Sequence, residues 1–136
     1  MIRVRTIDHL VLRTDNVEEM VRVYSDLLCC PIERTLPPDT GLTQLRAGHA
    51  LIDIVSVDSE LGRAGGGPPG ATENNLDHFC LQLEDIGQED LREWLESNGV
   101  ETGSFETRYG AQGFGPSIYI SDPDGNTIEL RSRTDS

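Results

Sequence analysis

The clearest deficit in this sequence of 136 residues is positive charge. Eleven Lys and Arg residues stand against twenty-four Asp and Glu residues, which gives a formal net charge of -13. A surface this acidic repels the phosphate backbone of nucleic acids and anionic membrane surfaces. We therefore expect neither nucleic acid nor a membrane among the partners of this protein.

Long apolar runs are absent as well. No stretch approaches the roughly 20 apolar residues that a membrane-spanning helix needs. The N-terminal "MIRVRTIDHL" enters a strand pattern at once and lacks the apolar core of a signal peptide. These absences predict a cytoplasmic protein.

Cysteines and aromatic residues are also few. The three cysteines are Cys29, Cys30 and Cys80, and an odd number that includes an adjacent pair excludes a simple disulfide framework. We expect reduced thiols. Cys80 shares a strand face with His78 and could line a cleft, but we expect it to be a small core residue. Aromatic residues make up 5% of the chain, and the few present, Tyr109 and Phe114 included, could line an apolar pocket, although we expect them to fill the core.

A repeated pair of residues organises the rest of the sequence. "IDHLVL" at residues 7 to 12 and "LDHFCL" at residues 76 to 81 each place an Asp-His pair among apolar residues, although the chain has only three histidines. A shift of 69 residues superimposes His9 on His78 and Asp8 on Asp77. A structural module that occurs twice, with one histidine in each copy, explains this repetition.

The order of predicted elements supports two modules. In the first half we predict a strand over 7–14, a helix over 14–30 that Asp15 or Asn16 caps and Pro31 ends, and strands over 42–48 and 49–58. Residues 60–75 are rich in Gly, Pro and Asn and predict a flexible linker.

The second half repeats this order. It predicts a strand over 76–83, a helix over 85–99 with Leu91, Trp94 and Leu95 inward, and strands over 116–121 and 126–132. The turn "DPDG" joins the last two strands, and the glycines of 108–117 predict a mobile loop.

These elements predict an α+β fold. Two βαβββ modules would pair into one curved, open, barrel-like sheet with flanking helices. The chain would form a single domain over 1–136, with module 1 at about 5–59, the linker at 60–75 and module 2 at about 76–133.

Four side chains could meet in this arrangement. Strand alternation places His9 on one face with Val11 and Arg13, and His78 on one face with Cys80 and Gln82. A carboxylate interrupts an apolar run near the end of each module, at Asp53 and at Glu129, and the pseudo-symmetry of the modules would bring the four side chains together. Two imidazoles with carboxylates suit a divalent first-row metal. Hydrogen-bonded structural histidines and carboxylates on a solvated sheet face remain the alternatives. We assign no chemistry to Asp8 and Asp77 and expect His49 at the surface.

Several motifs resemble the vicinal oxygen chelate superfamily, which includes glyoxalase I, bleomycin-resistance proteins and extradiol dioxygenases. They are "IDHLVL", "VYSDLL", "LDHFCLQL" and "IYISDPDGNTIEL", and they extend over nearly the whole chain. The resemblance implies that His9, His78 and Glu129 bind a divalent metal, which could be Ni, Zn, Mn, Co or Fe. Asp53 stands where glyoxalase I has a glutamate ligand.

The same resemblance implies that Arg13 binds a glutathione carboxylate, as the equivalent arginine does in glyoxalase I. Two other glutathione positions do not match, because Val57 replaces an Asn and Asn74 replaces a basic residue. A thiol conjugate is therefore expected more firmly than glutathione itself.

Three functions follow as expectations. The first is a metal-dependent lyase or isomerase, similar to lactoylglutathione lyase, that acts on a small α-oxo compound or hemithioacetal with Glu129 as the base and Asp53 opposite. The second is an Fe(II) extradiol dioxygenase that uses His9, His78 and Glu129, with Tyr109 or Tyr119 as an acid–base group. The third is a non-catalytic small-molecule binding or resistance protein. Small relatives also imply a homodimer whose two metal sites each draw on both chains.

Overall fold

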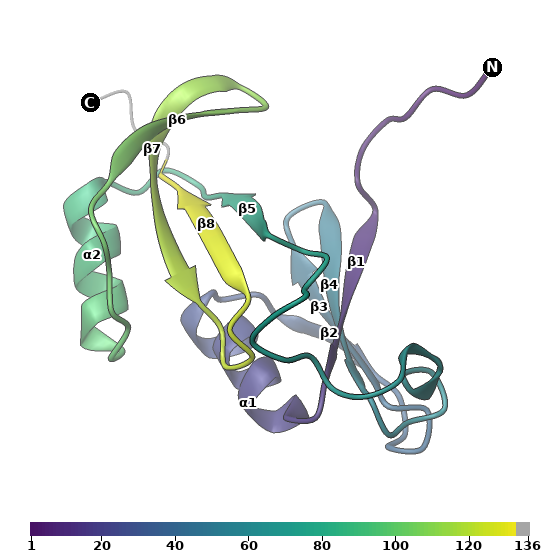
Figure 1. The fold of residues 1–136 in the computed structure, drawn as a ribbon. Coiled ribbons are helices and arrows are strands. Elements are labelled where there is room, and N and C mark those ends of the chain that lie inside the picture. The colour runs from purple at the N-terminus through teal and green to yellow at the C-terminus, as the bar shows by residue number, and fades with distance from the viewer. Residues whose placement is uncertain (133–136) are drawn as a thin grey trace. The chain divides into compact units, whose positions relative to one another are not determined.

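The computed structural model describes residues 1–132, which form two units that divide between Thr72 and Glu73 (Figure 1). The elements of the first unit are β1 (His9–Thr14), α1 (Val17–Arg22), a π-helical turn (Val23–Leu27), β2 (Ile32–Thr35), β3 (Leu42–Ala47), β4 (Ala50–Ser56) and a 3-10 turn (Arg63–Gly65). Those of the second are β5 (His78–Gln82), α2 (Gln88–Ser97), β6 (Glu106–Gly110), β7 (Gly113–Ser121) and β8 (Thr127–Arg131). The predicted βαβββ order occurs twice, and β2 and β6 are the strands for which the sequence pattern indicated no range.

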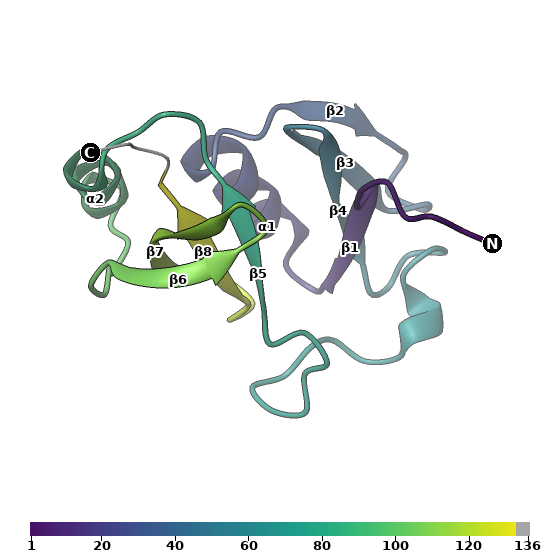
Figure 2. The same ribbon diagram turned by 90° about the horizontal axis from the view of Figure 1, so that it is seen from above.

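The two sheets have the same topology. The strand order is β1-β4-β3-β2 in the first unit and β5-β8-β7-β6 in the second. In each sheet the first strand pairs in parallel with the last, and the other pairs are antiparallel. Both sheets are open, and Figure 2 shows their end strands from above. The α+β prediction is confirmed.

Residue alternation along the last strand of each sheet separates an apolar face from a functional face. In β4, Ile52 and Ile54 are buried and Asp53 points to the opposite side between them. In β8, Ile128 and Leu130 take the buried apolar positions on either side of Glu129. Helix α1 packs against β4, so it covers the apolar face and leaves the other face for the carboxylate.

The first helix is shorter than predicted. It begins near Asn16, whose side chain makes no capping hydrogen bond, and it finishes at Leu27 rather than at Pro31. Cys29 adopts a left-handed conformation with φ of 58°, which turns the chain out of the helix before the proline. No helix among residues 1–132 is long and apolar enough to cross a membrane.

The second unit corrects the prediction of a mobile loop over 108–117. Gly110 pairs with Gly113, so β6 and β7 form a hairpin with the two-residue turn Ala111-Gln112. Gly110 and Gly113 therefore flank the tight turn of a hairpin, and the prediction of a loop at these glycines is wrong. Tyr109 and Phe114 lie exposed on this hairpin with ring centroids 5.0 Å apart, so the expectation that they fill the core is wrong.

The second helix lies within its predicted range of 85–99 and is shorter at both ends, at Gln88–Ser97. Leu91 and Leu95 are buried, and Gly99 ends the segment with φ of 75°. Trp94 is 42% exposed, because it lies at the edge of the helix face that Leu91 and Leu95 bury. The "DPDG" turn is confirmed: a carboxylate oxygen of Asp122 accepts hydrogen bonds from the backbone N–H groups of Asp124 and Asn126, each at 2.9 Å.

Candidate metal centre

In the first unit, His9 and Asp53 occupy one face of the sheet. The parallel register pairs Val11 with Asp53, so His9 lies one same-face position before the carboxylate on the neighbouring strand. Asp53 is 3% exposed, and its Oδ1 atom has no hydrogen-bond partner. A buried carboxylate oxygen without a partner carries a desolvation cost that a bound cation would offset.

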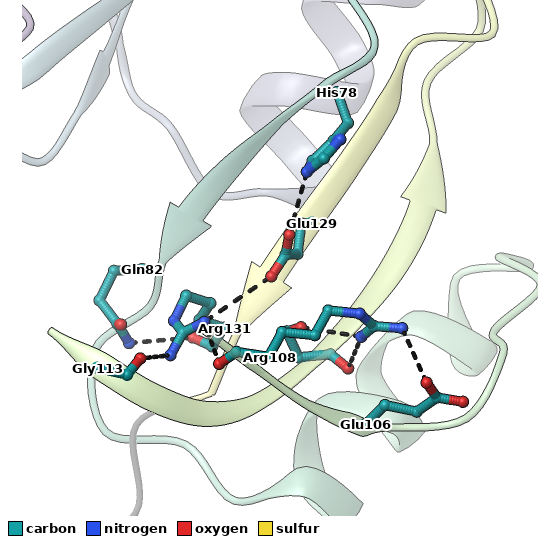
Figure 3. Close-up of polar contacts among 8 residues, drawn as sticks. His78, Gln82, Glu106, Arg108, Gly113, Glu129 and Arg131 are labelled. Atoms are coloured by element: carbon teal, nitrogen blue, oxygen red, sulfur yellow. Dashed lines mark hydrogen bonds and ion pairs between the residues drawn. The ribbon is translucent and has the colours of Figure 1, made fainter. Parts of the chain in front are cut away.

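The second unit repeats this arrangement with His78 and Glu129 (Figure 3). Here Cys80 takes the place of Val11 and pairs with Glu129. The Nε2 atom of His78 lies 3.3 Å from Oε1 of Glu129, and the carboxylate is 5% exposed. Each unit therefore presents one imidazole and one buried carboxylate on the same sheet face.

Both histidines are oriented by the aspartate that precedes them. The Nδ1 atoms of His9 and His78 lie 2.7 Å from carboxylate oxygens of Asp8 and Asp77. An ionised carboxylate can only accept, so Nδ1 carries a proton, and Nε2, which in His78 faces Oε1 of Glu129, is the ring nitrogen that would bind a metal. The hydrogen bond to Asp8 raises the pKa of His9, and the charge of Asp53 adds to this effect.

These aspartates were missed by the sequence reasoning, which assigned them no chemistry. The signal was present in the repeated Asp-His pair itself. A carboxylate beside a candidate metal-binding histidine is the usual partner of the second ring nitrogen. His49 is exposed, as predicted.

A cavity of about 290 Å³ lies beside His78 and Glu129 in the second unit. Cys80 is exposed to it, so the expectation of a core thiol is wrong. Its side chain shares a sheet face with His78 because the two residues are separated by two positions on β5. Desolvation by the surrounding protein raises the pKa of the Cys80 thiol to about 11, and the charge of Glu129 acts in the same direction.

Arg131 closes the cavity under the hairpin. Its guanidinium is nearly buried and donates to the carbonyl oxygens of Arg108 at 3.1 Å and Gly113 at 2.9 Å (Figure 3). Its Nη1 atom also lies 3.9 Å from Oε2 of Glu129. One buried cation therefore fixes the hairpin and neutralises part of the charge of the carboxylate.

Arg13 lies on the same face of β1 as His9, but its guanidinium is engaged by the chain itself. It donates to the carbonyl oxygens of Gly62 at 2.8 Å, Gly67 at 3.2 Å and Gly66. These carbonyls belong to the predicted linker, so Arg13 anchors the start of that segment to the first sheet. A substrate carboxylate would have to displace at least one of these hydrogen bonds.

The four candidate ligands fit a divalent metal by their chemistry. Residues 1–132 contain no group of three or more His, Cys, Asp or Glu side chains gathered as a metal site, and each unit supplies one His and one carboxylate. The oriented Nε2 atoms and the unpartnered Oδ1 of Asp53 are the donors that a first-row divalent cation binds.

Residues 6–130 match the family model of the Glyoxalase/Bleomycin resistance protein/Dioxygenase superfamily. The chain belongs to this superfamily. Its members bind small molecules, generally use divalent metals and often form dimers.

Solved structures share the superfamily fold over nearly the whole chain. A protein from the mobile metagenome of V. pseudocholerae is 26% identical with a TM-score of 0.78, and the match covers 99% of each chain. A virulence protein from Salmonella typhimurium is 24% identical with a TM-score of 0.76, covering 98% of this chain and 100% of that one.

A lactoylglutathione lyase from Agrobacterium tumefaciens is 21% identical with a TM-score of 0.64, covering 93% of this chain and 92% of that one. At these identities the similarity to the Salmonella and Agrobacterium proteins shows the fold alone. No curated protein matches the chain in sequence.

Proposed function

We propose that this protein is a metal-dependent lyase or isomerase of the glyoxalase I type. The observation that supports the proposal is the repeated pair of an aspartate-oriented histidine and a buried carboxylate on one sheet face, His9 with Asp53 and His78 with Glu129. These four residues would hold one divalent metal. When bound, the metal would supply Lewis-acid stabilisation of negative charge on two neighbouring substrate oxygens.

The residues of the chain would carry out the proton transfer. Glu129 lines the cavity and would take a proton from the substrate carbon and return it to the neighbouring carbon. Arg131 holds one of its oxygens from 3.9 Å, which limits how the carboxylate turns. Asp53 would act from the other module. The cavity volume of about 290 Å³ suits a small α-oxo compound or a hemithioacetal.

The thiol component of the substrate is proposed to be smaller than glutathione. Arg13 would be the residue that recognises the tripeptide carboxylate, but it donates to three carbonyl oxygens of the chain. Losing hydrogen bonds to a charged donor costs about 1.5–3 kcal/mol each, and the substrate would have to repay this cost. The three hydrogen bonds of Arg13 thus favour a structural role for this residue over a role in glutathione binding.

A ring-cleaving dioxygenase is the second candidate, and the position of Tyr119 favours it. The ring of Tyr119 lies edge-on to His78 with centroids 5.5 Å apart, beside the residues that would bind Fe(II). The guanidinium of Arg108 lies 4.3 Å from the centre of the same ring. Tyr119 would then supply the acid–base group that this chemistry requires.

Metal analysis tests the proposed site directly. The untagged protein should bind about one divalent metal per complete site, and His9→Ala, His78→Ala and Glu129→Ala should each weaken binding by orders of magnitude because each removes a direct ligand bond. His49→Ala is the matched control, since His49 is exposed and should not affect the metal. Stoichiometric metal in all three ligand variants would place the site elsewhere.

Activity assays then separate the functions. The protein reconstituted with Ni(II), Zn(II), Mn(II) or Fe(II) should convert methylglyoxal with a small thiol, and Arg13→Met should alter this turnover little. Turnover restricted to catechols with Fe(II) would instead support the dioxygenase. A protein that binds metal but converts neither class of substrate would be a binding protein.

A further inference from the structure

A row of polar side chains crosses the first sheet to Asp53. Arg34 on β2, Gln44 on β3 and Asp53 on β4 stand at paired positions of neighbouring strands. The Nε atom of Arg34 donates to Oε1 of Gln44 at 2.8 Å, and Nε2 of Gln44 donates to Oδ2 of Asp53 at 3.2 Å. The row therefore ends on one oxygen of the carboxylate and leaves the other, Oδ1, without a partner.

An irregularity in β2 creates this row. Ile32 pairs with Leu45 and Arg34 pairs with Gln44. Between these two pairs the register moves by two residues along β2 and by only one residue along β3. In a regular ladder Arg34 would pair with Thr43 and would point to the apolar face. A β-bulge of this kind redirects a side chain to the other face of a sheet. Here it brings the guanidinium of Arg34 onto the face that carries Asp53.

The row also determines which way the amide of Gln44 faces. A guanidinium has donors and no acceptor, so the group of Gln44 that faces Arg34 must be the carbonyl oxygen. The NH2 group then faces Asp53, and it can only donate. The carboxylate of Asp53 is thus held at Oδ2 by a donor whose orientation is fixed by a second residue.

We propose that Gln44 is a positioning residue for the metal ligand Asp53, and that Arg34 fixes the orientation of Gln44. The inference rests on the proposed metal site. Gln44 holds Oδ2 so that Oδ1 is presented as the ligand atom. The long side chain of Gln44 matches the short side chain of Asp53 across the gap between β3 and β4.

The second unit has a different residue at the position equivalent to Gln44. The residue of β7 that pairs with Glu129 is Tyr119, whose ring faces His78. The nearest cation to Glu129 is Arg131, which approaches from β8 itself. Glu129 therefore lacks an amide that holds one oxygen from the neighbouring strand, and a donor of the Gln44 kind is specific to Asp53.

Variants that change the side-chain lengths of Gln44 and Asp53 test the proposal. The probe is Zn(II) alone, and its affinity is measured by competition with a chromophoric chelator. Gln44→Leu should bind Zn(II) about 10–100-fold more weakly than the wild type, the range found when a residue that orients a metal ligand is lost. Gln44→Asn and Asp53→Glu should each weaken binding, because the side chains are then too short or too long for the gap.

The double variant Gln44→Asn/Asp53→Glu is the decisive measurement. It restores the summed length of the two side chains, so it should bind Zn(II) more tightly than either single variant. A purely structural role for Gln44 predicts instead that the losses of the two single variants multiply. That result, or wild-type affinity in Gln44→Leu, would overturn the proposal.

Arg34 has a matched control in Arg46. Both arginines lie on the β2–β3 ladder, but Arg46 donates its hydrogen bonds to the carboxylate of Glu33, whereas Arg34 donates to Gln44. Arg34→Met should weaken Zn(II) binding and Arg46→Met should not. Unfolding in EDTA should show that Gln44→Asn and Arg34→Met are folded. If the wild type binds no Zn(II), both the proposed function and the role of Gln44 are wrong. If the wild type binds Zn(II) and Gln44→Leu binds it equally well, only the role of Gln44 is wrong.

Discussion

Asp8 and Asp77 are among the most exposed side chains of the candidate site, at 89% and 97%. Exposed ion pairs contribute little to the stability of a fold, so these aspartates are not explained by folding. Each aspartate instead orients its histidine, since its hydrogen bond to Nδ1 sets the tautomer and the plane of the imidazole. A small, solvent-exposed contact can thus matter more for metal binding than for stability.

At this scale we predict a change in the titration of His9. In the metal-free protein, Asp8→Asn should lower the pKa of His9, because the hydrogen bond that favours the protonated ring then comes from a neutral acceptor. The midpoint can be followed by the NMR shift of the ring protons against pH. Asp77→Asn removes the same charge from the second unit and should leave the midpoint of His9 in place. An unchanged midpoint in Asp8→Asn would show that another group raises this pKa.

Among the elements, the β6–β7 hairpin depends on space at two glycines. A Cβ atom at Gly110 would lie 2.9 Å from the guanidinium of Arg131, and one at Gly115 would lie at the same distance from its Nη2 atom. The guanidinium cannot withdraw freely, because it is nearly buried and bonded to two carbonyl oxygens. These glycines are therefore required by the packing of an arginine, not by a flexible loop.

We predict that Gly110→Ala destabilises the protein by about 1–3 kcal/mol, the usual cost of overpacking a filled site. Urea unfolding of the metal-free protein measures this loss. Gly103→Ala is the control, because nothing lies within 4 Å of a Cβ atom there, and its effect should stay within about 0.5 kcal/mol. Equal stability of the two variants would mean that Arg131 moves aside at no cost.

The elements also show how far the sequence could be read. Alternation within β4 and β8 was enough to place Asp53 and Glu129 opposite the apolar face, because it depends only on neighbours in the chain. The row from Arg34 to Asp53 could not be predicted, since it depends on a bulge in β2 and on pairing between strands. The hairpin at 110–113 was missed because glycines occur in tight turns and in loops alike.

On the scale of the whole molecule, the division of the ligands between two units bears on how a complete metal site is assembled. Each holds half of the proposed ligand set, so a complete site needs two units, from one chain or from two. A unit of this size also leaves sheet edges and an apolar face to be covered. We propose a homodimer in which His9 and Asp53 of one chain meet His78 and Glu129 of the partner chain.

Subunit exchange tests this model. Mixing the inactive variants His9→Ala and Glu129→Ala should regenerate activity, because in a mixed dimer both defects fall in one site and the other site is intact. The maximum is one active site for each mixed dimer, and each variant exchanged with itself is the control. If mixed dimers form, as native mass spectrometry would show, and activity stays absent, each chain builds its own site.

The continuity of each sheet along the chain has a consequence for how such a protein can evolve. All four strands of a sheet come from one uninterrupted stretch, so a break between the units cuts no ladder. Duplication of one unit, or an exchange of the order of the two units, would therefore leave each sheet complete. Each half could then vary without the other, and the two differ in this structure, where an amide lies beside Asp53 and an aromatic ring lies beside His78.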